Sequence, residues 1–417
     1  VLNALFAQPV HRKVLDNGLT VLVREDSSSQ VSSVQLWVKT GSIHEGPLLG
    51  AGVSHYLEHM LFKGTEKRSG KEISREVQSL GGYINAYTTF DRTVYYIDLP
   101  SEHTSEAIEI LADAGFNSTL PAEEVEKERD VILREIDMGK DDPDQQLGRA
   151  LFETAYRTHP YKYPVIGYKD IFETVTRDEL LDYYHARYVP NNMVLVITGD
   201  VIADELFESA ARILEPFPRK RLESVYIPDE SRALAKREQA LSGEVNISRI
   251  GLGFTIPGLH HDDAAGISLL AAVLGSGDSS ILWQRLRQDL GVVHHVDVTT
   301  WNPGTSGLLW VSMIADPDKK EAALEAFWKE IEALKKTVIE DARLQRSQRQ
   351  SMVGEINNRK TMSGQAARIG AAEVVVGDQD YPRVYLEKLR QVKAEDLQRL
   401  LNEYVVPDRL TQVTFDP

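Results

Sequence analysis

The residues of this chain that most clearly suggest chemistry are His55, Glu58 and His59, within the stretch Gly50–Thr65. On a helix, two histidines four positions apart lie on one face, about 40° from each other, so both imidazoles can reach one metal ion. Glu58 projects from the same side, where its carboxylate can address a water on that metal. The order His-x-x-Glu-His is the inverzincin signature. The motif therefore favours a zinc site; the alternative is a pair of helix-face histidines without a metal.

A third ligand is expected elsewhere in the chain, because catalytic zinc usually has three protein ligands and one open position. The stretch Pro121–Asp137 is predicted to form a helix that its proline opens. Glu128 and Glu135 stand seven positions apart on it, two turns along one face, so both could point at the histidines. Glu128 could also be an ordinary solvated charge, since acidic residues are favoured in the first turns of helices.

With these residues the chain resembles the pitrilysin, insulysin and mitochondrial-processing-peptidase family of inverzincin zinc peptidases, and within it the shorter bacterial two-domain members. In that family a ligand glutamate follows the motif by about 75 residues, and Glu135 stands 76 positions after His59. A supporting glutamate seven residues before the ligand corresponds to Glu128. The resemblance implies one Zn²⁺ per chain on His55, His59 and Glu135. It also implies Glu58 as general base and then acid, with Glu128 orienting a ligand.

A second family element corresponds to the stretch Asn85–Tyr95. The resemblance implies an edge strand and loop beside the zinc, with Asn85, Ala86 and Tyr87 as substrate-binding residues. An exposed edge offers unpaired N–H and C=O groups, to which an extended peptide can add as a further strand. Without the resemblance, residues 82–98 indicate only a strand pair rich in tyrosine and threonine.

The second half departs from the family at the Arg and Tyr that grip the substrate backbone. In the stretch Leu286–His294, Arg287 fits the family pattern, but His294 occupies the position of the tyrosine. Either His294 still donates a hydrogen bond to substrate, or a partner chain supplies a complete Arg/Tyr pair. Four such domains enclose a chamber in the family, so this chain is expected to form half of a clamshell. The intact zinc motif beside an altered pair favours a heterodimer with a related subunit, and a homodimer is the alternative.

Composition limits the possible partners and compartments. The formal net charge is −16 and no basic run exceeds Arg219–Arg221, which argues against binding to nucleic acid or an anionic membrane. Cysteine is absent, so a metal site must use nitrogen and oxygen ligands. No apolar run approaches the roughly 18 residues of a membrane span. The stretch Val1–Pro9 could be the tail of a trimmed export signal, with Ala4 and Ala7 loosely like a cleavage site. We therefore expect the bacterial periplasm, with the cytoplasm as the alternative.

Two alignments indicate an internal duplication. Gly52–Met60 matches Gly266–Leu274 at an offset of 214, and Val175–Leu180 matches Val392–Leu397 at an offset of 217. Two homologous halves follow from these offsets. The predicted organisation is a zinc-bearing domain, a polar linker and a C-terminal copy, at residues 1–215, 216–243 and 244–417.

The second half is predicted to be a structural copy without zinc. Its residues at the motif positions are Leu269, Ala272 and Val273, whose side chains cannot bind a metal. The fold class that the patterns favour is α+β, with two α/β sandwich domains, each a mixed and mostly antiparallel sheet with helices on one face. The predicted strands cover 19–24, 31–39, 193–199, 246–255 and 307–315. The predicted helices cover 51–62, 70–80, 103–117, 122–138, 145–155, 202–214 and 318–337.

Two function classes follow from these observations. The first is a zinc endopeptidase that hydrolyses oligopeptides or unfolded segments, acting as the zinc-carrying subunit of a dimer. The second is a non-catalytic structural subunit of a similar complex. A chain without catalysis has no chemical need for Glu58 between two ligands, so the retained motif favours the peptidase.

Overall fold

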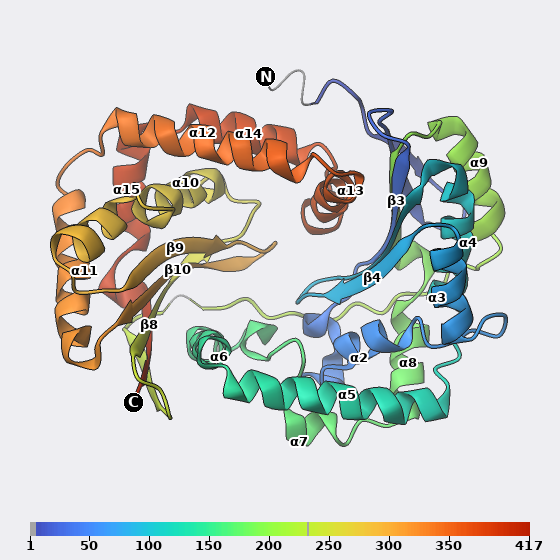
Figure 1. Cartoon of the computed structure of the whole chain (residues 1–417), viewed down its shortest axis with the longest axis horizontal. Helices are drawn as coiled ribbons and strands as arrows, with labels where there is room; N and C mark the ends of the chain where they lie inside the picture. Colours follow the sequence, from blue (N-terminus) through green and yellow to red (C-terminus); the bar gives the residue numbers. More distant parts are fainter. Residues whose placement is uncertain (1–5, 232) are drawn as a thin grey trace. The chain divides into compact units, whose positions relative to one another are not determined.

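A computed structural model describes residues 6–231 and 233–417, which form two compact units, each built on one sheet (Figure 1). The first unit comprises residues up to 137, 163–227 and 356–383, and the second comprises 138–162, 228–355 and 384–417. Residues 1–5 of the stretch considered as an export signal lie outside the described residues. Within the described ranges, no helix has both the length and the apolar character needed to cross a bilayer.

The first unit contains a six-stranded sheet in the order β1-β2-β6-β3-β5-β4. Its strands are β1 His11–Val14, β2 Thr20–Glu25, β3 Val31–Val38, β4 Tyr83–Thr88, β5 Thr93–Pro100 and β6 Met193–Gly199. All pairs are antiparallel except β2 with β6, which is parallel. At the centre Val34 pairs with Ile97 and Ile197, and all three side chains are fully buried. The strand β4 is an edge, as the family resemblance implied.

Helices cover this sheet and form the main core with it. They are α2 Val53–Met60, α3 Gly70–Ser79, α4 Thr104–Asn117, α5 Ala122–Asp141, α7 Lys169–Phe172, α8 Arg177–Arg187 and α9 Ala203–Leu214. The predicted helices at 51–62, 70–80, 103–117, 122–138 and 202–214 correspond to five of them. Apolar residues from α2, α5 and α8, such as Leu57, Ile132 and Leu180, are fully buried in one cluster.

The second unit repeats this design strand by strand. Its sheet order β7-β11-β8-β10-β9 reproduces β2-β6-β3-β5-β4, and its one parallel pair, β7 with β11, corresponds to β2 with β6. The elements are α6 Pro143–Ala155, β7 Arg237–Ser242, β8 Ser248–Pro257, α10 Ala264–Gly275, a π-helix Trp283–Asp289, β9 His295–Trp301, β10 Ser306–Ala315, α11 Lys320–Leu334, α12 Asp341–Asn358, α14 Tyr381–Gln391, α15 Ala394–Tyr404 and β11 Leu410–Asp416. Repetition of the strand order supports the duplication inferred from the sequence.

The predicted linker 216–243 differs from the structure at its end. Residues 237–242 form β7, the counterpart of β2, and pair in parallel with β11. The strand was not expected because its sequence, Arg-Glu-Gln-Ala-Leu-Ser, is mostly polar. An edge strand tolerates polar side chains because much of its surface faces water.

Each sheet also carries a helix on its second face, where the sequence predicted helices on one face only. In the first unit that helix is α13 Met362–Ala371, whose Ile369 packs with Trp37. In the second unit it is α6, whose Leu151 packs with Phe415. Gly370 allows the close approach of α13, because a Cβ there would lie 2.2 Å from the Trp37 ring. The units therefore combine segments from both halves of the chain.

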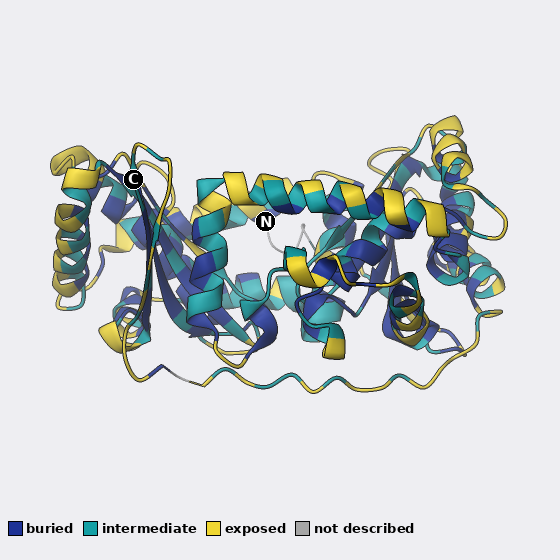
Figure 2. Cartoon of the chain, turned by 90° about the horizontal axis from the view of Figure 1, so that it is seen from below, coloured by how far each residue is buried: buried dark blue, intermediate teal, exposed yellow. Residues whose placement is uncertain are grey.

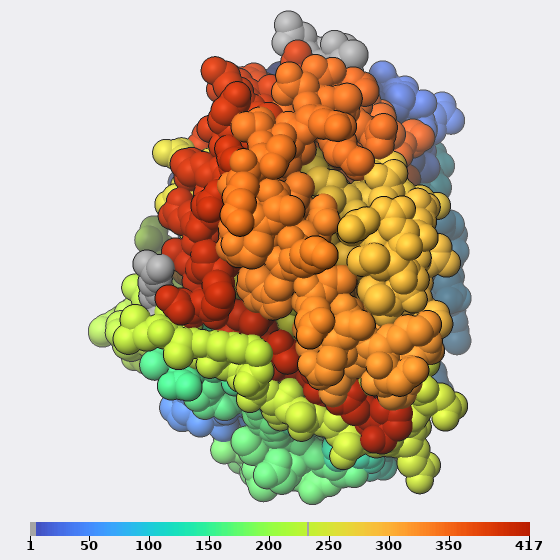
Figure 3. All heavy atoms as spheres, turned by 90° about the vertical axis from the view of Figure 1, so that its left-hand side faces the viewer, coloured from blue at the N-terminus to red at the C-terminus, as the bar shows by residue number. Residues whose placement is uncertain are grey.

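The burial pattern agrees with these layers. Figure 2 shows the strands largely in dark blue and the outward surfaces of the helices in yellow. Figure 3 shows one face of the second unit, on which α11 and α15 lie as orange and red spheres. The seven residues of β6 are all buried, which is typical of a strand covered on both faces.

Candidate metal centre

The helix α2 presents His55, Glu58 and His59 as its only partly exposed residues, and the other five positions are buried. Its N-terminus is fixed by Glu45, whose carboxylate accepts hydrogen bonds from the backbone N–H of Gly52 at 3.2 Å and Ser54 at 2.9 Å. These bonds satisfy donors that a helix start leaves unpaired. Burial anchors five positions of α2 and therefore holds the other three toward the site.

Gly52 is required at the start of α2 for two reasons. Its φ of +69° lies in the left-handed region, which residues with a Cβ rarely adopt. A Cβ on Gly52 would also lie 2.3 Å from the carbonyl oxygen of Ile166. The segment around Ile166 therefore packs directly on the turn that orients the motif helix.

The helix α5 brings the two glutamates to α2. Tyr56 is buried and donates from its hydroxyl to the carbonyl of Val125 at 2.5 Å, which ties the two helices together. The apolar face of α5 is buried through Ile132 and Ile136. Glu128 and Glu135, two turns apart, consequently face the histidines as the spacing predicted.

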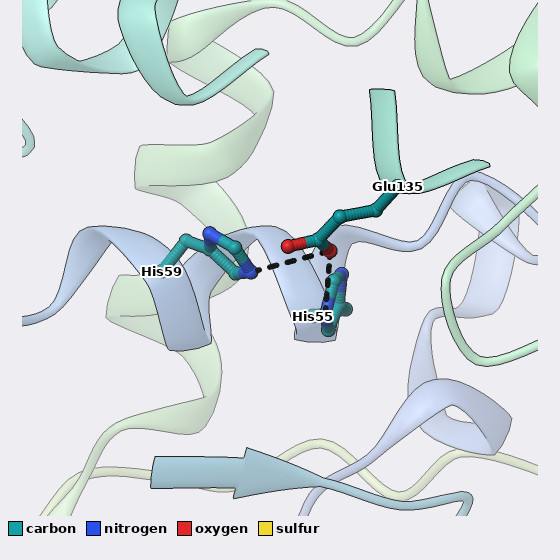
Figure 4. Close-up of side chains that lie close together, drawn as sticks. All are labelled: His55, His59 and Glu135. Atoms are coloured by element: carbon teal, nitrogen blue, oxygen red, sulfur yellow. Dashed lines mark ion pairs between the residues drawn. The ribbon is translucent and has the colours of Figure 1, made fainter. Parts of the chain in front are cut away.

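Three donor atoms converge between these helices. In Figure 4 the two histidine rings project from α2 and the Glu135 carboxylate approaches them from α5. Glu135 Oε2 lies 3.8 Å from His55 Nε2 and 3.7 Å from His59 Nε2. One ligand atom from each residue lies within 4.8 Å of the other two, and within the described residues only this group of His and acidic side chains has the spacing to hold a metal.

The donor set fits a metal ion such as zinc. The separations of 3.7 and 3.8 Å are too long for hydrogen bonds. Two imidazoles and one carboxylate are the ligand types that hold catalytic zinc with one position left open. Burial, and after it the neighbouring His59, lowers the pKa of His55 to about 3. Its imidazole is therefore neutral at neutral pH, which is the form that binds metals.

Glu128 holds the second histidine ring. Its Oε2 lies 3.0 Å from His59 Nδ1, and its Oε1 accepts a hydrogen bond from Lys63 Nζ at 2.5 Å. Burial alone would raise the pKa of Glu128, but the hydrogen bonds from Lys63 and His59 together bring that pKa below its usual value. A carboxylate on Nδ1 fixes the tautomer that leaves Nε2 free to bind a metal. By contrast, the buried Nδ1 of His55 has no hydrogen-bond partner among the described residues.

Glu58 and the edge strand border one hollow of about 1220 Å³, which is lined by Glu58 and His59 from α2 and by Ile84, Asn85 and Ala86 from β4. Burial raises the pKa of the Glu58 carboxyl above its usual value. A general base works best when its pKa is near the operating pH, so this shift suits that role.

Asn85, Ala86 and Tyr87 lie on β4, but their side chains divide between its two faces. Ala86 packs against the core on the helix-covered side. The Tyr87 ring packs on the other side, edge-on to Trp37 with centroids 6.3 Å apart. Asn85 Nδ2 donates to the Tyr83 hydroxyl at 2.8 Å. Among the three predicted substrate-binding residues of β4, Asn85 and Ala86 border the hollow.

Arg287 and His294 lie in the second unit and contact each other. Arg287 Nε donates to the backbone carbonyl of His294 at 2.8 Å, and its guanidinium lies 4.4 Å from the centre of the Trp283 ring. The His294 Nε2 atom lies 2.7 Å from Asp316 Oδ1. Both side chains thus have partners within their own unit, and their substrate-binding role remains a prediction.

Three residues that support the site were not identified from the sequence. Lys63 lies four positions after His59, just past the end of α2, and this short separation was the only signal for its contact with the same glutamate. Nothing in the sequence indicated that Tyr56 supports the site, apart from its position inside the motif. Glu45 precedes α2 by a loop, and no local pattern marks a carboxylate that reaches forward to cap a helix.

Comparisons with known proteins show the family of this chain. Residues 20–169 match the family model described as insulinase (peptidase family M16), and residues 174–351 match the peptidase M16 inactive domain. A zinc protease of Rickettsia bellii is 30% identical over 93% of each chain, and zinc protease YmxG of Bacillus subtilis is 26% identical over 96% of each chain. The crystal structure of a protease from Helicobacter pylori superposes with a TM-score of 0.93 and 26% identity, covering 98% of this chain and all of that one. The chain therefore belongs to the insulinase family, peptidase family M16.

Proposed function

We propose that this protein is a zinc-dependent endopeptidase that hydrolyses oligopeptides or unfolded segments. The observation that carries the proposal is the convergence of His55, His59 and Glu135 beside Glu58 at the edge of a sheet. The names of the relatives, which are zinc proteases, support the choice of metal.

Different residues of the chain have different roles in hydrolysis. His55, His59 and Glu135 would hold the zinc, which when bound supplies Lewis acidity and makes a water molecule more acidic. Glu58 takes the proton of the attacking water and delivers it to the leaving amine, so it acts first as base and then as acid. Glu128 keeps the His59 ring in the orientation that binding requires.

The edge strand β4 offers the binding mode for substrate. Its outer backbone groups have no strand partner in the described sheet, and its residues border the same hollow as Glu58. An extended peptide that pairs with β4 would place its backbone beside the carboxylate. This mode favours unfolded or short peptides, because a folded segment cannot extend along the edge.

Cleavage of a quenched fluorescent peptide by the purified chain with zinc tests the proposal. We expect wild type to cleave and Glu58→Gln to retain zinc while its rate falls by about 10²- to 10⁴-fold. Metal content, measured by atomic emission on both proteins, separates a lost base from a lost metal. Loss of zinc from Glu58→Gln, with wild type loaded, would contradict the role of Glu58.

The proposal includes a dimer in which this chain is the zinc-carrying subunit. Arg287 and His294 already have partners in their own unit, which supports a related subunit that supplies an Arg/Tyr pair. A homodimer is the alternative. Light scattering of the purified chain gives its mass, and zinc-loaded protein that is inactive alone but active with a second related chain would identify the heterodimer.

The second candidate function is a non-catalytic structural subunit. The observation that favours it is the match of residues 174–351 to a model described as an inactive domain. That match covers the half in which the motif positions are Leu269, Ala272 and Val273. Zinc binding without cleavage, alone or with any related subunit, would favour this candidate.

A further inference from the structure

The hollow beside the metal centre extends away from Glu58 over the loop and helix that follow α2. Five of its lining side chains are cations, and five are acidic. The cations are Lys63, Lys67, Arg68, Lys71 and Arg75, and the acidic residues are Glu58, Glu66, Glu72, Glu123 and Glu124. The formal balance is neutral, so the charge that a ligand meets depends on which of these groups are already paired.

Two of the five cations are committed to internal partners. Lys63 bonds to Glu128 at 2.5 Å. Arg68 forms a bidentate pair with Glu76 at 2.7 Å and reaches Asp113 at 2.9 Å. Neither of these side chains has its full charge available to a ligand.

The remaining cations are Lys67, Lys71 and Arg75, all exposed. None of the three forms an ion pair within 4.0 Å of an acidic group in the described part of the chain. Lys71 and Arg75 are one turn apart on α3, and Gln78 continues the same stripe along the hollow. The opposite face of α3 is buried through Ile73 and Val77, which fixes the stripe toward the hollow.

Three acidic residues of the lining have partners of their own, although they keep part of their negative charge. Lys127 pairs with Glu123 at 2.8 Å and with Glu124 at 2.9 Å. Glu72 accepts from the backbone N–H of Ser69 at 2.7 Å in the capping box of α3. Glu66 and the general base Glu58 complete the acidic lining. Lys67, Lys71 and Arg75 are therefore the lining cations that have no ion-pair partner among the described residues, in a chain whose net charge is −16.

The edge strand forms the other wall of the hollow through Ile84, Asn85 and Ala86. Side chains of an extended peptide alternate between two faces, so a peptide paired with β4 directs every second side chain to one side. The three cations line the same hollow as these residues of β4. An acidic side chain there would meet unpaired positive charge.

We propose that Lys67, Lys71 and Arg75 form a specificity subsite for a peptide carboxylate near the cleaved bond, so that segments bearing Asp or Glu are preferred substrates. This inference rests on the proposed peptidase function. A carboxylate can come from an internal acidic side chain or from the C-terminus of the peptide. Lys67 in the loop before α3 and Lys71 and Arg75 on α3 spread the positive charge over three side chains, which favours the internal side chain.

Binding to the zinc-loaded Glu58→Gln protein tests the subsite without turnover. The probes are three rhodamine-labelled decapeptides of otherwise equal sequence: Glu-containing and amidated, Gln-containing and amidated, and Gln-containing with a free C-terminus. We expect the Glu peptide to bind about three- to thirtyfold more tightly than the amidated Gln peptide, as two or three exposed ion pairs allow. The difference should shrink at about 1 M salt, where exposed charges are screened.

Charge reversal shows whether these cations cause the preference. Lys67→Glu, Lys71→Glu and Arg75→Glu together should abolish or invert it, while the matched variant Arg219→Glu, Lys220→Glu and Arg221→Glu should keep it. The matched residues are exposed and outside the lining, and they change the net charge equally. Equal affinity for the Glu and amidated Gln peptides, or a preference that survives the first triple variant, would overturn the subsite.

Four further outcomes are informative. If only the free C-terminus improves binding, the subsite for internal acidic side chains is overturned. If wild type cleaves a mixed peptide library without regard to acidic residues, the subsite fails while the peptidase function stands. If wild type cleaves nothing and no probe binds, the proposed function fails and the subsite fails with it. A cleavage preference for acidic residues that the first triple variant inverts would support both.

Discussion

The two units share one strand order and one parallel pair, yet their corresponding helices α2 and α10 meet opposite surroundings. In α2 the three motif residues are partly exposed, and Glu58 and His59 border a hollow of about 1220 Å³. In α10, Leu269 and Val273 are buried, and the space that Ala272 and Val273 share with Ser347 and Gln350 of α12 is about 10 Å³. The scaffold is thus kept in both copies, and the site exists only where helix packing leaves one face open.

The largest effect is expected when the three motif residues are placed on α10, whose equivalent positions are closely packed. Leu269→His, Ala272→Glu and Val273→His together should destabilise the second unit by about 4 kcal/mol or more, because they bury polar groups without partners. We expect zinc content to stay at one ion per chain. Thermal unfolding and metal analysis measure both effects, and Leu269→Ala with Val273→Ala controls for lost volume. A second bound zinc would show that packing does not decide where the site forms.

Removing the ligand that α5 supplies, Glu135, tests the metal centre of the first unit directly. Glu135→Gln should weaken zinc binding by more than about a hundredfold, since even groups that only orient a ligand contribute 10- to 100-fold. Chelator competition gives the affinity. Asp130→Asn, an exposed change on the same helix, is the control and should leave the affinity unchanged. Equal affinity in Glu135→Gln and wild type would rule out Glu135 as a ligand.

A smaller effect is expected for Glu128, whose carboxylate contacts Nδ1 of His59. Glu128→Gln should weaken zinc binding by about tenfold, because the amide no longer carries the charge that holds the Nδ1 proton and Lys63. The same chelator competition measures it, with the exposed Glu126→Gln as control. A loss as large as that of Glu135→Gln would indicate that Glu128 itself binds the metal.

The capping carboxyl group of α2 should be visible as a pH dependence of stability. Burial raises the pKa of Glu45 from its usual 4.5 to about 8. Between these values the folded protein holds a proton that the unfolded chain has released, so this contribution to the free energy of unfolding is full below pH 4.5 and falls as pH rises through 8. Glu45→Gln should flatten the trend in urea unfolding from about pH 5 to about pH 9. An unchanged slope would exclude Glu45 as its source.

Local periodicity predicted the parts of the site that depend on a single helix. The spacings of four between the histidines and of seven between the glutamates each place side chains on one face, and α2 and α5 realise both. The predicted helix at 70–80 is α3, which Ser69 and Glu72 cap. The pairing of α2 with α5 came from the family resemblance, because spacing along one helix says nothing of its neighbour.

What the sequence did not reveal depends on contacts between distant segments. The strand β7 has a polar sequence, so hydrophobic alternation could not indicate it. The apolar stripes of α6 and α13 show that each helix packs on something, but not which sheet it covers. The continuous apolar run Met193–Ile197 of β6 was a usable signal, since a strand buried on both faces needs a cover on each.

Each half of the chain supplies the helix, α6 or α13, that covers the second face of the other half's sheet. This arrangement has a consequence for how the protein is synthesised. All six strands of the first sheet have been synthesised once translation reaches residue 199. Ile369 of α13, which packs on Trp37, Val94 and Val196, is synthesised much later. During that part of translation one apolar face of the nascent sheet lacks its native cover, the condition in which chains aggregate or recruit chaperones. Synthesis of residues 362–417 therefore completes both the first unit and the second.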